Sequence, residues 1–389
     1  MTRRREDEWT RRRFLVTAGG VAAGTLVGAA LGDAASSPTI RSTPAAGGNH
    51  KPRAGVAMSP ALTAAAADLR RLVTGRALTV DDPWVLMHAV LPLGADARHG
   101  DEPILDYVTR TWLEPVARGG AQYAAFPLKV EAHPNHFLEI MYATAVPPER
   151  AFASRMGRVT RADLTRGAKA LFTPAIQGDE LSWTVSVLTA ESKPDADRFE
   201  NADGRAFTVS AVVEAAAQAG EAGYADTVAA MRGTKPYGRS AVQEYACNGT
   251  HVVYAVLDAV RNGYRGSRLP ERATALLQAL LYRLGPEVAL IDKVIGAEPG
   301  AQLNADAAKL QFLGHAIENA RFAQHHHLYA PTPAEQAAIA TAEEQLAGIA
   351  HRLTTTYDLD TLARQVPRAY SLILGDACHA LHAAEIEVA

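Results

Sequence analysis

From Pro60 onward, hydrophobic residues recur three and four positions apart, the spacing that gathers them on one face of an α-helix. Turn-forming residues separate the segments, and no run alternates between hydrophobic and polar residues as a half-buried strand does. The pattern predicts about a dozen helices, at residues 61–74, 83–91, 104–113, 133–146, 160–172, 181–190, 207–218, 241–261, 271–284, 287–295, 305–327, 333–354 and 359–386.

Helix-capping residues mark several of these boundaries. Asp81 and Asp82 precede a proline that suits a first helical turn, and Thr160 with Asp163 has the form of a capping box. Short loops make consecutive helices antiparallel neighbours. The sequence therefore predicts an all-α protein, either a closed (α/α) toroid around a central cavity or an open solenoid. No fixed-period repeat is visible, which favours the toroid.

The amino terminus has the features of an export signal. Residues 10–16, Thr-Arg-Arg-Arg-Phe-Leu-Val, resemble the twin-arginine motif, and a weakly hydrophobic stretch continues to Leu31. The resemblance implies handling by the twin-arginine export machinery and a periplasmic or secreted protein with no stable membrane span after processing. A single-span anchor and a basic disordered tail are the alternatives. We expect a signal peptide at 1–35, a disordered linker at 36–59 and one domain at 60–389.

Composition limits the classes of partner. The chain has 389 residues, 48% of them hydrophobic and 21% charged, with a net charge of −3, so it has no basic footprint for nucleic acid. No glycine-rich phosphate loop, Gly-x-Ser-x-Gly elbow or Asp-rich diphosphate motif is present. Phosphoryl transfer and serine hydrolysis therefore rank low.

Both cysteines have a histidine four residues later, namely Cys247 with His251 and Cys378 with His382. Positions four apart share a helix face, so two such helices could supply the thiolates and imidazoles of a zinc or copper site. A Cys247–Cys378 disulfide and two unpaired thiols are the alternatives. Asn248-Gly249 is a turn signal that could take Cys247 out of the helix.

A second group contains His133, His136 and Glu139, with His88 as a further histidine. His136 and Glu139 lie three apart on a predicted helix, so the imidazole and carboxylate could touch and serve as an acid or a base. His88 lies among large hydrophobic residues, where a core histidine bonded to a backbone carbonyl is the simpler interpretation.

His315 and Glu318 repeat the three-residue spacing, beside Gly314. Residues 313–319, Leu-Gly-His-Ala-Ile-Glu-Asn, resemble the Gly-His-x-x-Glu helix segment of the N-acylglucosamine and cellobiose 2-epimerase family. That resemblance implies an (α/α)6 barrel in which this histidine and glutamate face a sugar site.

These groups lead to three functional hypotheses. The first is an enzyme that binds a carbohydrate or another small polar substrate in a central cavity and acts by histidine and glutamate acid-base chemistry. The second is a metal-binding protein, and the third is a scaffold that binds a partner protein. The predicted cavity residues are His133, His136, Glu139, Cys247, His251, His315 and Glu318.

Overall fold

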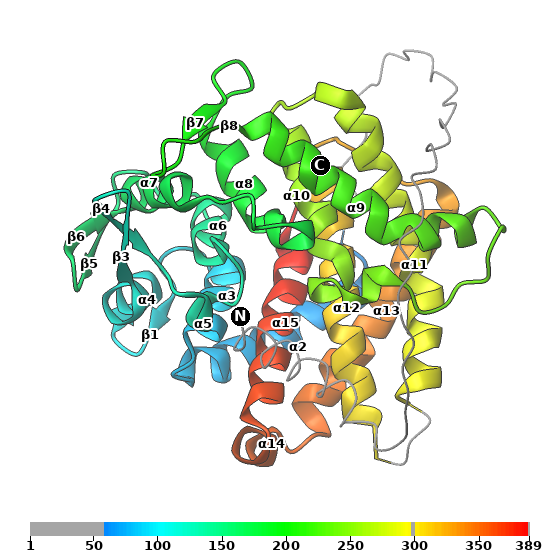
Figure 1. Ribbon diagram of the computed structural model, residues 1–389. Helices are drawn as coiled ribbons and strands as arrows, with labels where there is room; N and C mark the ends of the chain where they lie inside the picture. Colours follow the sequence, from blue (N-terminus) through cyan, green and yellow to red (C-terminus); the bar gives the residue numbers. More distant parts are fainter. Residues whose placement is uncertain (1–57, 297–299, 388–389) are drawn as a thin grey trace, which may run out of the picture. The chain divides into compact units, whose positions relative to one another are not determined.

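Helices dominate a computed structural model that describes residues 58–296 and 300–387 (Figure 1). The predicted all-α class is confirmed at this level. The expected signal peptide and residues 36–57 of the expected linker lie outside the described residues. The α-helices are α2 (Pro60–Gly75), α3 (Pro83–Leu93), α4 (Ile104–Trp112), α5 (Leu128–Glu131), α6 (His136–Ala143), α7 (Arg161–Leu171), α8 (Leu181–Glu191), α9 (Val209–Met231), α10 (Thr250–Arg261), α11 (Leu269–Val294), α12 (Gln302–His325), α13 (Pro333–Thr355), α14 (Leu359–Gln365) and α15 (Pro367–Glu385).

Four small antiparallel hairpins were not predicted from the sequence. Their strands have two to five residues, too few for an alternating pattern to stand out from the helical segments around them. The strands are β1 (Arg98–His99), β2 (Glu102–Pro103), β3 (Glu114–Arg118), β4 (Ala121–Ala125), β5 (Ala151–Ser154), β6 (Gly157–Thr160), β7 (Arg198–Glu200) and β8 (Ala206–Thr208).

The predicted helix caps are present at α3 and α7. The Asp82 carboxylate accepts a hydrogen bond from the Trp84 N–H at 3.0 Å, which satisfies an unpaired donor at the start of α3. At α7 the Thr160 hydroxyl accepts from the Asp163 N–H while the Asp163 carboxylate accepts from the Thr160 N–H, so the capping box is confirmed.

Several predicted boundaries are wrong, and α9 continues to Met231 although the sequence pattern predicts an end at residue 218. Gly285-Pro286 does not divide a helix, because α11 continues through it, and the buried ion pair between Arg283 and Glu287, at 2.9 Å, spans the proline. Conversely, the predicted helix at 359–386 is broken at Val366, whose φ of −137° and ψ of 64° are not helical. Pro367 follows directly and disfavours a helical conformation in the residue before it.

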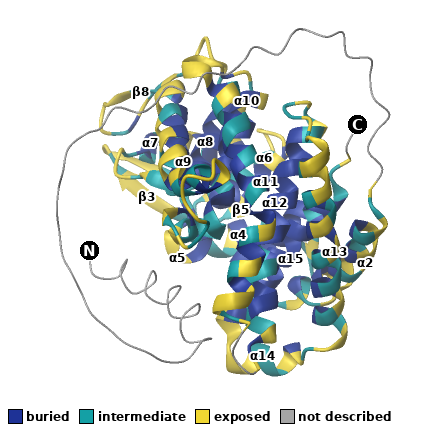
Figure 2. Cartoon of the chain, turned by 90° about the vertical axis from the view of Figure 1, so that its right-hand side faces the viewer, coloured by how far each residue is buried: buried dark blue, intermediate teal, exposed yellow. Residues whose placement is uncertain are grey.

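Helix α15 packs against α12, α3 and α2, while α10 packs against α8 and α11 (Figure 1). Buried residues gather along α10, α12 and α15 (Figure 2). Two glycines permit close approaches to α15. A Cβ on Gly375 would lie 2.2 Å from the Trp84 ring, and one on Gly314 would lie 3.0 Å from the Ala380 Cβ.

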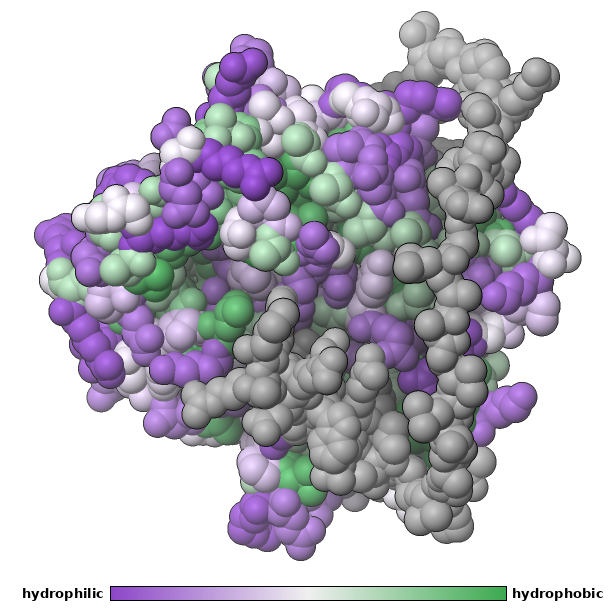
Figure 3. All heavy atoms as spheres, viewed as in Figure 1, coloured by the Kyte–Doolittle hydropathy of each residue, from purple (hydrophilic) through white to green (hydrophobic). Residues whose placement is uncertain are grey.

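The face of the described residues that Figure 3 shows mixes polar and hydrophobic residues. The exposed large hydrophobic residues among the described ones belong to different segments of the chain. None of the described helices is long and hydrophobic enough to cross a membrane. The exposed large hydrophobic residues are Met58, Val116, Leu128, Met231, Val294 and Val366.

Gly375→Ala should destabilise the protein by about 1–3 kcal/mol, because the added methyl group overlaps the Trp84 ring and forces α3 and α15 apart. The matched control is Gly75→Ala at the end of α2, where an added Cβ meets nothing within 4 Å. That change should raise the stability by up to about 1 kcal/mol. Urea unfolding of both variants measures the difference, and equal stabilities would contradict the packing of Trp84 on α15.

Candidate metal and acid-base site

Five helices each place one imidazole in the centre of the described unit. These rings are at van der Waals or edge-contact distance from their neighbours, with centroids 4.7 Å apart for His88–His136, 5.1 Å for His88–His379, 3.9 Å for His315–His379 and 4.8 Å for His251–His315. They come from α3, α6, α10, α12 and α15. The predicted convergence of histidines from distant segments is therefore present, and it includes His379, which sequence reasoning missed.

Backbone carbonyls orient three of these rings. His88 and His315 each bond through Nδ1 to the carbonyl four residues earlier in the same helix, at 2.6 and 2.7 Å, and His136 bonds to the Glu131 carbonyl at 3.1 Å. A carbonyl can only accept, so the hydrogen-bond network assigns the proton to Nδ1 and a lone pair to Nε2. The carbonyl partner proposed for His88 is confirmed, and the same arrangement prepares Nε2 to bind a metal ion.

Burial keeps these imidazoles neutral. It lowers the pKa of His88, His136 and His251 well below the ordinary value, and neighbouring histidines lower it further. Burial, with the adjacent His379, lowers the pKa of His315 to about 3. Neutral imidazole is the form that binds metal ions, so at neutral pH these four rings offer lone pairs rather than positive charge.

Cys247 reaches this centre from a left-handed turn, so the predicted helix over 241–261 is wrong at this point. The φ angles of Cys247, Asn248 and Gly249 are 46°, 57° and 76°, and α10 begins only at Thr250. Asparagine and glycine tolerate this conformation better than most residues. The buried Arg283 fixes the turn by donating a hydrogen bond to the Asn248 carbonyl at 2.6 Å.

Cys247, His251 and His315 form a group that could hold a metal ion. One ligand atom from each residue lies within 4.8 Å of the other two. In a tetrahedral zinc site, bonds of about 2.0–2.3 Å place ligand atoms about 3.5 Å apart, so a small contraction would complete the geometry. This is the only such group of three or more His, Cys, Asp or Glu residues in the part of the chain that the structure describes.

The second predicted pair does not join that group. No disulfide links the two cysteines, and Cys378 is fully buried in α15, where burial and the nearby Asp376 raise the pKa of its thiol. His382 turns instead to Glu318, with 2.6 Å between Nδ1 and Oε1. The four ligands proposed from the two Cys-x3-His pairs are therefore divided between two places among the described residues.

Glu318 joins two histidines of α15 rather than pairing with His315. Its second oxygen lies 2.9 Å from the His379 Nδ1, so one carboxylate holds both His379 and His382. Burial alone would raise the pKa of Glu318, but the two imidazoles lower it well below the ordinary value, so this buried carboxylate is ionised. The signal for His379 was its spacing, since His379-x2-His382 repeats His133-x2-His136.

His133 and Glu139 lie at the edges of the cluster. The His133 ring stacks on Trp183 at 3.8 Å, and its Nδ1 is 3.1 Å from the Glu180 carboxylate. Trp183 also contacts His251, at 4.8 Å between ring centroids. The proposed contact between His136 and Glu139 is not made among the hydrogen bonds of the structure, because His136 turns to the Glu131 carbonyl and Glu139 faces a separate pocket.

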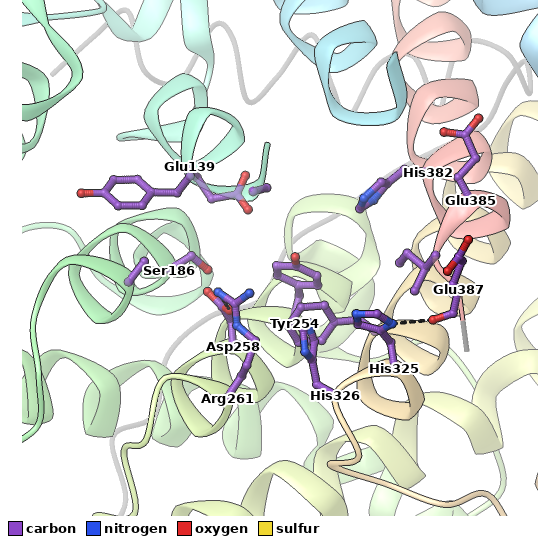
Figure 4. Close-up of a pocket in the computed structure, with 15 residues that line it drawn as sticks. Glu139, Ser186, Tyr254, Asp258, Arg261, His325, His326, His382, Glu385 and Glu387 are labelled. Atoms are coloured by element: carbon purple, nitrogen blue, oxygen red, sulfur yellow. Dashed lines mark hydrogen bonds and ion pairs between the residues drawn. The ribbon is translucent and has the colours of Figure 1, made fainter. Parts of the chain in front are cut away.

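That pocket has a volume of about 420 Å³ (Figure 4). Glu139 and His382 lie on opposite sides of it, and Asp258 is paired with Arg261 at 2.8 Å. Burial and the carboxylates of Asp258 and Glu318 raise the pKa of Glu139 to about 8. Burial raises the pKa of Asp258 to about 6, although Arg261 opposes the shift. The pocket therefore holds two carboxyl groups suited to acid-base chemistry near neutral pH.

Comparisons with known proteins add no assignment. The chain matches no known protein family, and no curated protein or solved structure is significantly similar to it.

Glu139→Gln should remove a pH dependence of stability. The pKa of Glu139 is about 8 in the folded chain, whereas its ordinary value is 4.5. Between these two pH values the folded chain keeps the carboxyl proton and the unfolded chain loses it. The free energy of unfolding of the wild type therefore falls as pH rises through this window. Relative to the wild type, the glutamine variant should gain up to about 1.4 kcal/mol per pH unit in this window. Denaturant unfolding from pH 5 to 8 measures it. Glu149→Gln, at an exposed position, is the control, and parallel curves for wild type and Glu139→Gln would contradict the assignment.

Proposed function

We propose that this protein binds one transition-metal ion through Cys247, His251 and His315. One observation carries the proposal: the thiol and the two imidazoles, from a left-handed turn, α10 and α12, have ligand atoms within 4.8 Å of one another. Burial keeps the imidazoles neutral. Thiolate and neutral imidazole are the ligands that zinc and copper prefer in proteins.

The ligand types favour zinc or copper over harder ions. Magnesium and calcium prefer oxygen ligands, whereas one thiolate with two imidazoles suits tetrahedral zinc or the trigonal arrangement of one cysteine and two histidines in copper electron-transfer centres. The surrounding residues add support, because the backbone carbonyl bonded to the His315 Nδ1 fixes the ring orientation in the way that outer-shell partners of metal-bound histidines do.

The proposal is consistent with export through the twin-arginine pathway, which we also propose for this chain. That pathway carries folded proteins, so a buried metal ion could be loaded before export. We further propose that the helices form an (α/α) toroid. The support is that α3, α6, α10, α12 and α15 all direct a histidine to one centre.

A second candidate function is acid-base catalysis on a carbohydrate or another small polar substrate in the 420 Å³ pocket. The observation that favours it is the pair of carboxyl groups with separated pKa values, about 8 for Glu139 and about 6 for Asp258. At neutral pH Glu139 would act as the acid and Asp258 as the base or stabilising charge. Tyr254 and Phe322 add aromatic faces of the kind that pack against sugar rings.

Cys247→Ala should abolish stoichiometric metal binding, because it removes the thiolate of the proposed site. Cys378→Ala is the matched control: it changes the only other cysteine in the chain to the same residue and should leave metal content unchanged. Elemental analysis of protein purified after native export, with zinc and copper measured separately, gives the number of ions per chain. We expect about one ion in the wild type and in Cys378→Ala, and an affinity more than about 100-fold weaker in Cys247→Ala.

Loss of the ion in both cysteine variants would instead support a site that uses both Cys-x3-His pairs. Wild-type protein with no zinc or copper, before or after dialysis against each ion, would contradict the proposal. Unfolding curves of the metal-free wild type and of both cysteine variants show whether a variant is folded, and therefore whether its lower metal content reflects the lost ligand.

If the pocket catalyses acid-base chemistry, Glu139→Gln should lower kcat by about 10²–10⁴-fold for each sugar that the wild type converts, because glutamine cannot donate the proton. Glu102→Gln, outside the pocket, should leave kcat unchanged. Screening the wild type against reducing and glycosidic sugars comes first. Equal kcat values for Glu139→Gln and the wild type would eliminate Glu139 as the acid.

A further inference from the structure

We propose that His379 is a fourth ligand of the metal ion and that the buried carboxylate of Glu318 orients it. The inference rests on the proposed function, because it extends the site of Cys247, His251 and His315. It converts a three-ligand arrangement into a site with one thiolate and three imidazoles. It also gives Glu318 a defined role outside the set of ligands.

The first observation is that two ring nitrogens lie buried without a hydrogen-bond partner. The Nε2 atoms of His315 and His379 are both buried, and neither has a hydrogen-bond partner. His315 is 1% exposed and His379 is 6% exposed. Unpaired polar atoms at this depth are rare in folded proteins, and each requires an explanation. A shared metal ion would satisfy both atoms at once, after a movement that brings His379 into the 4.8 Å group of Cys247, His251 and His315, which does not include it.

The second observation is proximity. The rings of His315 and His379 are 3.9 Å apart at their centroids, and the His251 and His379 rings are 5.5 Å apart. The close packing of α12 on α15 makes this possible, since Gly314 presents no side chain where a Cβ would lie 3.0 Å from that of Ala380. Among the described histidines outside the proposed trio, His379 is thus the one whose ring contacts both His251 and His315.

The third observation is the orientation of His379. Its Nδ1 lies 2.9 Å from the Glu318 Oε2, and that carboxylate is 4% exposed. In the neutral ring the carboxylate accepts a hydrogen bond from Nδ1, so the Nε2 on the other side carries the lone pair. A carboxylate bonded to the far nitrogen of a metal-bound histidine fixes the ring and increases its basicity. Glu318 has this relation to His379.

A fourth protein ligand would change the chemistry of the site. Zinc sites with four protein ligands are structural, whereas catalytic zinc sites keep one position for water or substrate. A closed site of one thiolate and three imidazoles would therefore hold the ion, or exchange electrons if the ion is copper, without binding a substrate at the metal. Any substrate would then occupy the neighbouring pocket that His382 lines.

Cobalt(II) substitution of the full-length chain tests the inference. In the wild type we expect a thiolate-to-cobalt charge-transfer band and the intense visible bands of tetrahedral cobalt. His379→Gln should keep the charge-transfer band, lose visible intensity as the coordination changes, and bind cobalt more than about 10-fold more weakly. Glu318→Gln should weaken binding by about 10–100-fold with the bands retained.

His382→Gln is the matched control, because His382 shares Glu318 with His379 but lies on the pocket side. Its cobalt affinity should stay within about 3-fold of the wild type, since the nitrogen ligands are unchanged. An unchanged spectrum and affinity for His379→Gln, with a thiolate band in the wild type, would overturn the role of His379 and leave the proposed function standing. Absence of the thiolate band in the wild type would overturn both.

X-ray absorption at the zinc edge of the wild type tests the same claim without a variant, in case His379→Gln does not fold. The outer-shell scattering of imidazole rings reports how many are bound. One sulfur and three imidazoles would support the inference. One sulfur and two imidazoles, with the remaining position filled by water, would overturn it and leave the three-ligand site intact.

Discussion

The burial of neutral imidazoles in a helical core is the constraint on which the rest of the structure depends. A buried polar atom is tolerated only when it is paired. Here Nδ1 of His88, His136 and His315 is paired with a backbone carbonyl, and the buried Nε2 of His315 has no hydrogen-bond partner. Helix interiors have no spare N–H group to satisfy that lone pair, because each is used within the helix. The metal ion that we propose beside Cys247 would satisfy it.

A left-handed backbone turn, which is unfavourable for most residues, places the Cys247 thiol near the imidazoles of His251 and His315. Cys247 and Asn248 have positive φ angles, which cost free energy in residues other than glycine. Arg283, buried beside Glu287, compensates by donating to the Asn248 carbonyl, and Tyr224 donates to the Gly249 carbonyl at 3.2 Å. Strained backbone held in this way is typical of functional sites. Arg283 thereby connects the long α11 helix to the turn that carries Cys247, the proposed metal ligand.

The sequence allowed the helical class, most helix boundaries and several of the converging residues to be predicted. Hydrophobic periodicity and helix caps such as Asp82 and Thr160 depend only on residues close together in the sequence, so they can be read from it, and both caps are present in the structure. Partner choice is not local. Glu318 was paired with His315 because they share a helix, but its closest histidines come from α15, and no spacing along α12 contains that information. The turn at Cys247 was visible in Asn248-Gly249, yet its fixation by Arg283 depends on a residue 36 positions beyond Cys247.

A crystal structure of the protein with zinc or copper, read through the anomalous signal of that ion, tests the central claim most directly. The account predicts a single strong peak bonded to the Cys247 Sγ and to one ring nitrogen each of His251 and His315. A peak at Cys378 and His382, or only scattered surface peaks at saturating metal, would contradict it.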